Sequence, residues 1–205
     1  HIVGEGMNAR AEITDFWAMV FNPSAVDRLT HVWLGAFLAG TFLILSVHAY
    51  YILKNRHVEM SKKAFKIALV VATIFSLGQL LSGHKSADGV AENQPAKLAA
   101  MEGHFEKDAP ADLYLFGWVD KENQEVHGLK VPGGLSFLVD FDFGTPIKGL
   151  NNFKEKNRPP QVNAIFQFYH LMIAIGMFLI FLTLYAVVQW RRGKLFTDRR
   201  LLWVF

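Results

Sequence analysis

The polar side chains with the clearest chemical potential lie in one short segment, QPAKLAAMEG at residues 94–103. It carries the amide of Gln94, the amine of Lys97 and the carboxylate of Glu102. Gln94 or Lys97 could hydrogen-bond to a ring oxygen of a small molecule, and Glu102 could accept a hydroxyl proton as a general base. These residue types fit a site for an amphipathic molecule that releases protons, such as a quinol. The alternative interpretation is a solvated loop helix whose charges only face water.

The spacing within this segment predicts a short helix with two polar faces. Pro95 suits the first position of a helix and Gly103 suits its end. Lys97 and Glu102 are five residues apart, which places their side chains about 140° apart around a helix. The usual ion pair between residues four apart is therefore not expected. Gln94 and Lys97 share a face, and both interpretations of the segment stay open on this chemistry alone.

Two other side chains, His31 and Met172, could bind a metal centre. Histidines inside a membrane are costly and often functional, although His31 could equally be an interfacial residue bonded to a backbone carbonyl. Met172 lies in the apolar stretch FYHLMIAIG, where a methionine usually fills space in a core. One imidazole and one thioether around a planar cofactor would form a low-spin haem site. His170 is about 200° around the helix from Met172, so it is expected to face elsewhere, as an alternative ligand or a polar partner of the haem edge.

Three runs without Lys, Arg, Asp or Glu predict the elements that position these residues: 31–53, 67–82 and 161–190. A bilayer requires about 20 mostly apolar residues per helix. With their flanks, the runs predict an all-α bundle of three transmembrane helices at 24–53, 64–82 and 161–190. The second span is short, and it requires the ammonium group of Lys66 to reach an interface.

The charge distribution predicts the orientation of these spans. Basic residues cluster in the loop 54–63 and the segment 191–205, whereas the loop 83–160 carries nine basic and twelve acidic residues. Short basic loops stay in the cytoplasm. We therefore expect 54–63 and 191–205 in the cytoplasm, with a further helix able to begin at the end of the second, and 83–160 on the outer side.

The segments outside the membrane carry local structural signals. Residues 1–23 are expected to form an outer interfacial segment with a short aromatic helix over 12–21. Residues 113–119 and 125–131 alternate around a polar turn, which predicts a β-hairpin within the outer loop.

Composition excludes several kinds of site. The chain has no cysteine, which excludes disulfides, thiolate metal sites and haem attachment through CxxCH. The basic clusters are explained by topology, so no nucleic-acid partner is expected. The sequence starts without methionine and ends in LLWVF after a basic cluster, so we expect a piece of a larger multi-span subunit.

These segments together resemble subunit I of the bacterial cytochrome bd quinol oxidases. The loop sequence QPAKLAAMEGH is similar to the quinol-loop signature of that family. VFNPSAVDRLTHVWLGAFLAG and FYHLMIAIGMF resemble the helices that bear the histidine and methionine haem ligands, and FGWVDKENQEVHGLKVP resembles the hairpin region of the loop. The resemblance covers essentially the whole chain, with its motifs in the family's order.

The resemblance implies His31 and Met172 as axial ligands of a low-spin haem b, and Lys97 and Glu102 as quinol-site residues with Gln94 nearby. It implies a bundle in the bacterial cytoplasmic (inner) membrane that oxidises ubiquinol or menaquinol and reduces oxygen to water. It also implies a high-spin haem b and a haem d in the full complex, a partner subunit II and a small single-span subunit in some members.

The chain departs from the family in two respects. It has no counterpart of the family's first four helices or of its later GRQPW segment, so we expect it to hold the electron-entry site without the oxygen site. Some members have arginine where His170 stands, so less positive charge beside the haem is expected. Two other classes stay open: a membrane-anchor cytochrome b in which His31 pairs with a second histidine such as His170, and a haem-free structural or transport subunit.

Overall fold

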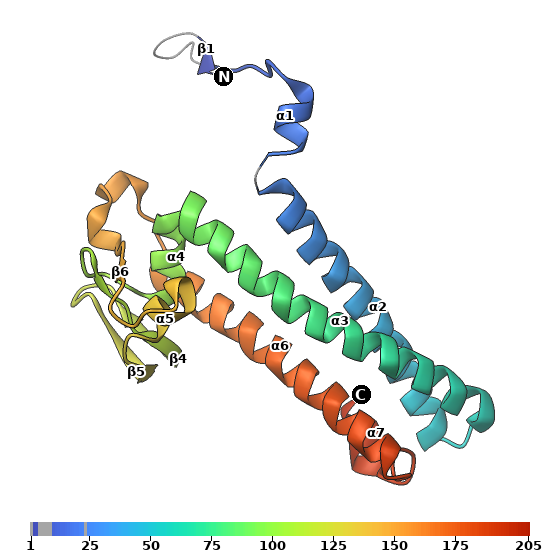
Figure 1. The fold of residues 1–205 in the computed structure, drawn as a ribbon. Helices are drawn as coiled ribbons and strands as arrows, with labels where there is room; N and C mark the ends of the chain where they lie inside the picture. The colour runs from blue at the N-terminus through green and yellow to red at the C-terminus, as the bar shows by residue number, and fades with distance from the viewer. Residues whose placement is uncertain (1, 4–9, 23) are drawn as a thin grey trace.

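The computed structural model describes residues 2–3, 10–22 and 24–205, and three long helices dominate it. They are α2 (Ala25–Leu53), α3 (Val58–Asn93) and α6 (Val162–Arg191), and α3 packs against both of the others (Figure 1). By length and composition, the described residues hold three segments able to cross a membrane, one in each of these helices. The fold is therefore mostly helical, with three candidate membrane-spanning helices.

The second long helix differs from the expected span 64–82. It begins at Val58 and continues to Asn93, so the first part of the expected loop 83–160 is helical. Val90 and Ala91 explain the extension, because they pack against a buried cluster of the outer loop. The helix ends before Gln94-Pro95, because the residue before a proline disfavours the helical conformation.

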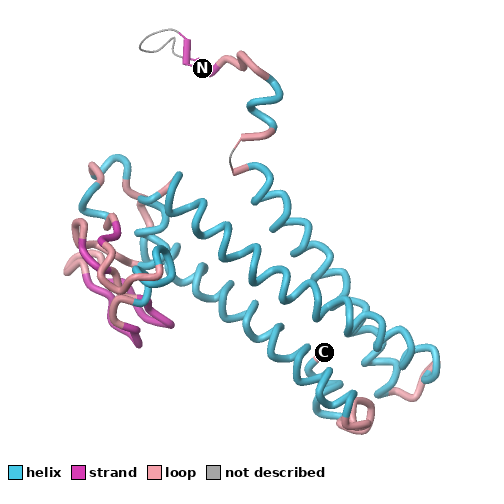
Figure 2. The backbone as a smooth tube through the Cα atoms, viewed as in Figure 1, coloured by secondary structure: helices cyan, strands magenta, loops and turns pink. Residues whose placement is uncertain are grey.

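The segment between α3 and α6 forms a small subdomain at one end of the bundle, which Figure 2 shows as a mixture of short helices and strands. We call it the outer subdomain, after the side of the membrane that the charge distribution predicts for it. Its helices are α4 (Pro95–Glu102), α5 (Gly134–Asp140) and two 3-10 turns, η2 (Leu150–Asn152) and η3 (Glu155–Asn157). β4 (Leu113–Asp120) pairs antiparallel with β5 (Glu125–Val131), and β3 (Ala109–Pro110) pairs with β6 (Pro146–Ile147).

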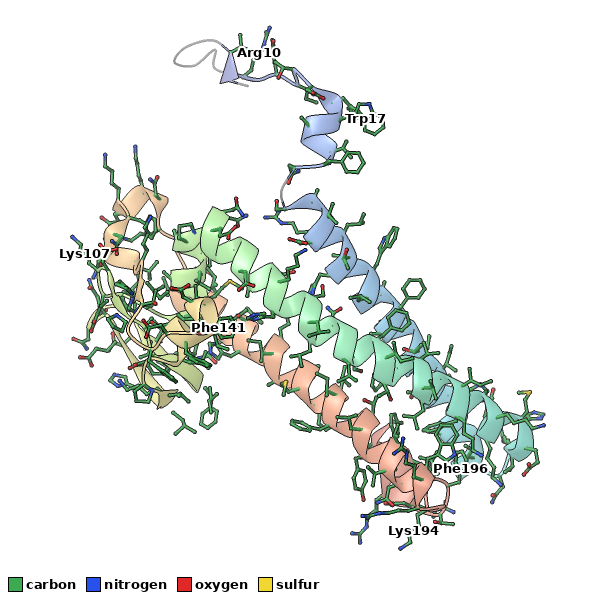
Figure 3. All side chains as sticks on the ribbon, in the orientation of Figure 1. Arg10, Trp17, Lys107, Phe141, Lys194 and Phe196 are labelled. Carbon is green, nitrogen blue, oxygen red and sulfur yellow. The ribbon has the colours of Figure 1, made fainter. Side chains whose placement is uncertain are left out.

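Separate apolar clusters stabilise the two ends of the molecule, which Lys107 and Lys194 mark in Figure 3. At the end marked by Lys194, side chains of α2, α3 and α6 pack with α7 (Arg199–Val204) and the turn before it. There the ammonium group of Lys66 lies 5.6 Å from the ring centre of Trp190 and 5.7 Å from that of Phe196. Its charge thus reaches the end of the bundle, as the short apolar span required.

The N-terminal segment is less helical than expected. The expected outer segment 1–23 includes residues 1, 4–9 and 23, which lie outside the described residues. The rest contains two short paired strands, β1 (Ile2–Val3) and β2 (Arg10–Ala11), and a helix, α1 (Phe16–Val20), that is shorter than 12–21. α1 starts late because the Asp15 carboxylate accepts from Ala18 N at 3.0 Å and so caps it there.

Gly103 ends α4 in a conformation that few other residues adopt. Its φ is +66°, and a Cβ atom would lie 2.6 Å from Cγ2 of Val126. We expect Gly103→Ala to destabilise the outer subdomain by about 1–3 kcal/mol, because the left-handed backbone and the crowding both oppose a methyl group. Limited proteolysis of the outer loop in the full-length protein would measure this. Gly89→Ala is the control, because a Cβ there meets nothing within 4 Å, and equal proteolysis of both variants would contradict the expectation.

Candidate functional site

The helix α4 carries Glu102 into the protein interior. Leu98, Ala99 and Ala100 are buried on the same helix and pack against the clusters of the outer subdomain. Glu102, at the end of α4, is only 2% exposed, whereas Lys97 is exposed on the other side. The two side chains therefore face different surroundings, in keeping with their spacing.

Glu102 is a buried acid whose pKa is higher than that of an ordinary glutamate. Burial raises the pKa of its carboxyl to about 7, and a hydrogen bond from the Tyr169 hydroxyl opposes part of this rise. Among the described residues, its Oε2 atom has no hydrogen-bond partner. A buried carboxyl with a free oxygen and a pKa near neutrality can take up and release a proton at physiological pH.

An apolar cavity of about 500 Å³ lies beside Glu102 and extends between the long helices. Its walls include His31 of α2, Gln79 of α3, and Tyr169 and Met172 of α6. This volume is within the range of cavities that bind cofactors and other small organic molecules. The structure thus brings together three of the six residues expected from the sequence, His31, Met172 and Glu102, although they lie far apart in the chain.

α3 holds the ring of His31 in place. The Nδ1 atom of His31 lies 3.2 Å from the Ser82 hydroxyl, and the Gln79 amide nitrogen lies 2.9 Å from Nε2 and 3.3 Å from Nδ1. Among the described residues, these ring contacts of His31 are with side chains and not with a backbone carbonyl. Ser82 is the kind of partner at Nδ1 that orients a metal-binding histidine, and in this arrangement the Gln79 amide occupies Nε2.

The residues near Met172 lie on two different faces of α6. Asn163, Gln167 and His170 face β4, where their side chains bond to backbone groups of that strand. Tyr169 and Met172, three residues apart, face the cavity. The spacing of about 100° per residue explains why neighbours in sequence have unrelated surroundings.

His170 is therefore not part of the cavity. Its Nδ1 lies 2.8 Å from Phe166 O and its Nε2 lies 2.7 Å from Tyr114 O, and its ring stacks on Phe166. Both nitrogens lie within hydrogen-bond distance of backbone carbonyl oxygens, and His170, unlike His31, is not among the residues that line the cavity. The structure thus corrects the idea that His170 pairs with His31, and it makes His170 a link between α6 and the hairpin.

Gln94 and Lys97 also lie outside the cavity walls. Gln94 stands at the junction of α3 and α4, and Lys97 faces solvent. Tyr169, Gln79 and Ser82 were not predicted from the sequence. The position of Tyr169 three residues before Met172 was a signal for the first of these, because side chains at that spacing share a helix face.

Comparison with known proteins identifies the family. The family model described as cytochrome bd terminal oxidase subunit I matches residues 2–205. The chain belongs to this family. Its structure is similar to that of the bd oxidase from Geobacillus thermodenitrificans, with a TM-score of 0.76 and 31% identity over 92% of this chain and 46% of that one.

Two curated members of the bd oxidase family from Bacillus subtilis (strain 168) are similar over most of this chain. A putative cytochrome bd menaquinol oxidase subunit I is 38% identical over 91% of this chain, and a cytochrome bd ubiquinol oxidase subunit 1 is 34% identical over 92%. The match covers 42% of each relative. The chain thus spans less than half the length of the bd oxidase subunits it resembles.

Proposed function

We propose that this chain forms the quinol-oxidising, low-spin haem b portion of a bd-type terminal oxidase in the bacterial cytoplasmic membrane. The observation that supports it most strongly is that His31, Met172 and Glu102 line one apolar cavity. A proton acceptor suited to a quinol and two donors suited to iron therefore surround a shared space. Family membership makes haem and quinol the expected ligands.

The residues around the cavity fit a haem. His31 and Met172 would supply the nitrogen and sulfur donors of a low-spin iron. Gly176 lies one turn after Met172, and a Cβ there would meet nothing within 4 Å, so space for a planar group exists beside the thioether. With Ser82 at Nδ1, His31 would hold the iron through Nε2 once the Gln79 amide, which lies 2.9 Å from that atom, turned away. When bound, the haem would supply a one-electron acceptor with a potential raised by the thioether.

In this proposal Glu102 performs the proton chemistry of quinol oxidation. Its unprotonated form accepts a hydroxyl proton, and a pKa near 7 keeps that form available at neutral pH. The Tyr169 hydroxyl donates a hydrogen bond to the carboxyl and so orients it. Lys97 and Gln94 would act on the water side of α4, at the approach of the polar head group.

The proposal places the subdomain between α3 and α6 on the periplasmic side, because the basic segments 54–63 and 191–205 lie at the other end. Electrons would pass to a high-spin haem b and a haem d held elsewhere in subunit I. Subunit II would complete the oxidase, with a small single-span subunit in some complexes.

Haem content and quinol-dependent oxygen consumption of the purified full-length oxidase test this function. We expect protohaem in a pyridine haemochrome assay and oxygen uptake driven by ubiquinol or menaquinol. A preparation without protohaem would support a haem-free structural subunit instead.

Ser82 provides a more specific test of the His31 assignment. We expect Ser82→Ala to weaken haem b retention about 10- to 100-fold, because the partner that orients the His31 ring through Nδ1 is lost. The measurement is the low-spin haem absorbance per subunit after detergent washing. Ser46→Ala on α2 is a matched control, because Ser46 lies outside the cavity walls and is exposed. Unchanged retention in Ser82→Ala would remove Ser82 from the haem site.

A further inference from the structure

We infer that the proton taken up by Glu102 leaves the protein through a second cavity in the outer subdomain, with His104 as the next proton carrier. This inference rests on the proposed function, because it requires Glu102 to be the first proton acceptor. Beyond that function, it assigns a route by which the proton leaves Glu102 and a role for His104 on that route.

The second cavity is polar and has a volume of about 510 Å³. Glu102 lines both this cavity and the apolar one, so this residue lies between them. The apolar cavity faces the long helices, whereas the polar one lies among α4, β3, β4 and β5. Its titratable lining residues are Glu102, His104, Glu106, Asp112, Tyr114, Glu125 and Lys130. Glu102 therefore has a mostly apolar cavity on one side and, on the other, a polar cavity whose titratable groups can receive its proton.

The hydrogen bonding of His104 fixes the nitrogen that can receive this proton. Its Nε2 lies 3.2 Å from the carbonyl oxygen of Ile147, which can only accept, so Nε2 carries the hydrogen. Nδ1 then has a free lone pair, and it has no hydrogen-bond partner among the described residues. The arrangement leaves His104 as a neutral base with one open acceptor atom.

The surroundings of His104 allow both uptake and release of a proton. Burial lowers the pKa of His104, while the Ile147 carbonyl and the charges of Glu106 and Asp112 oppose this effect. The ring is thus mostly neutral at pH 7, and the two carboxylates stabilise the imidazolium that forms during transfer. Asp112 is fixed by Lys130 at 2.6 Å and by the backbone N–H of Gly133 at 2.9 Å. Glu106 is exposed and leads to solvent.

The transfer is balanced in protons. The O–H bond of protonated Glu102 breaks, and an N–H bond forms at Nδ1 of His104, directly or through water of the cavity. That N–H bond then breaks as the proton passes to water near Glu106. Glu102 returns to its carboxylate and His104 to its neutral form, so one proton has moved outward.

Chemical rescue in the full-length oxidase tests this route. We expect His104→Ala to lower quinol-oxidase turnover by at least about tenfold, and added imidazole to restore most of it. His104→Gln, which keeps a polar side chain, is expected to show a similar loss at an unchanged low-spin haem content. His127→Ala, at an exposed position on β5, is the control and is expected to retain its turnover.

The outcomes separate this inference from the proposed function. Wild-type turnover in both His104 variants, together with a large loss in Glu102→Gln, would overturn the exit route and leave the quinol site standing. A turnover loss in His104→Ala that imidazole does not restore, with haem content intact, would also overturn it. Unchanged turnover in Glu102→Gln would remove the proposed quinol site and the exit route together.

Discussion

Glu102→Gln in the full-length oxidase is expected to lower quinol-dependent oxygen consumption by about 10²- to 10⁴-fold. Glutamine keeps the size and polarity of the side chain, so α4 and its packing are retained, but the amide cannot accept the hydroxyl proton. The low-spin haem content is expected to stay at the wild-type level. Glu92→Gln, at an exposed carboxylate near the end of α3, is the matched control and is expected to retain full turnover.

We also expect a specific direction for the pH dependence of the same reaction. A general base acts in its unprotonated form, so kcat/KM is expected to rise with pH through about 7, the pKa that burial gives Glu102. Tyr169→Phe removes a hydrogen bond that stabilises the carboxylate, so this rise is expected to move to higher pH. A profile that rises near the ordinary carboxyl pKa of 4.5 would contradict the role of buried Glu102.

Met172→Leu and His31→Ala are each expected to abolish the low-spin haem b signal in reduced-minus-oxidised spectra. Both donors line the apolar cavity, and a low-spin iron needs a strong ligand on each side. Leucine fills nearly the same volume as methionine without the thioether, so packing is little changed. Met177→Leu is a close control, because Met177 lies on the same helix and lines the same cavity.

The two variants also decide between ligand pairs. Loss of the low-spin signal in His31→Ala but not in Met172→Leu would favour a bis-histidine anchor and remove Met172 from the site. In that event His170 is a poor second ligand, because it is bonded to Phe166 O and Tyr114 O. The second histidine would then come from elsewhere in the oxidase.

At this site, the spacing of residues along a helix predicted which side chains share a face. The spacing of Lys97 and Glu102 predicted that they do not pair, and the structure places one in solvent and the other in the interior. The spacing of His170 and Met172 likewise predicted different faces of one helix. The same reasoning could not show which face is covered, because that depends on β4, which packs against α6 from a distant part of the chain.

The sequence by itself determined the family, the three apolar helices and the candidate haem and quinol residues. These follow from local properties: the length of an apolar run, the period of a helix and short motifs in order. Only the tertiary structure decided that α3 extends to Asn93, that Glu102 is buried against Tyr169, and that Glu102 shares a cavity with His31 and Met172. Burial and shared cavities arise from contacts between segments far apart in the chain, and no local pattern encodes them.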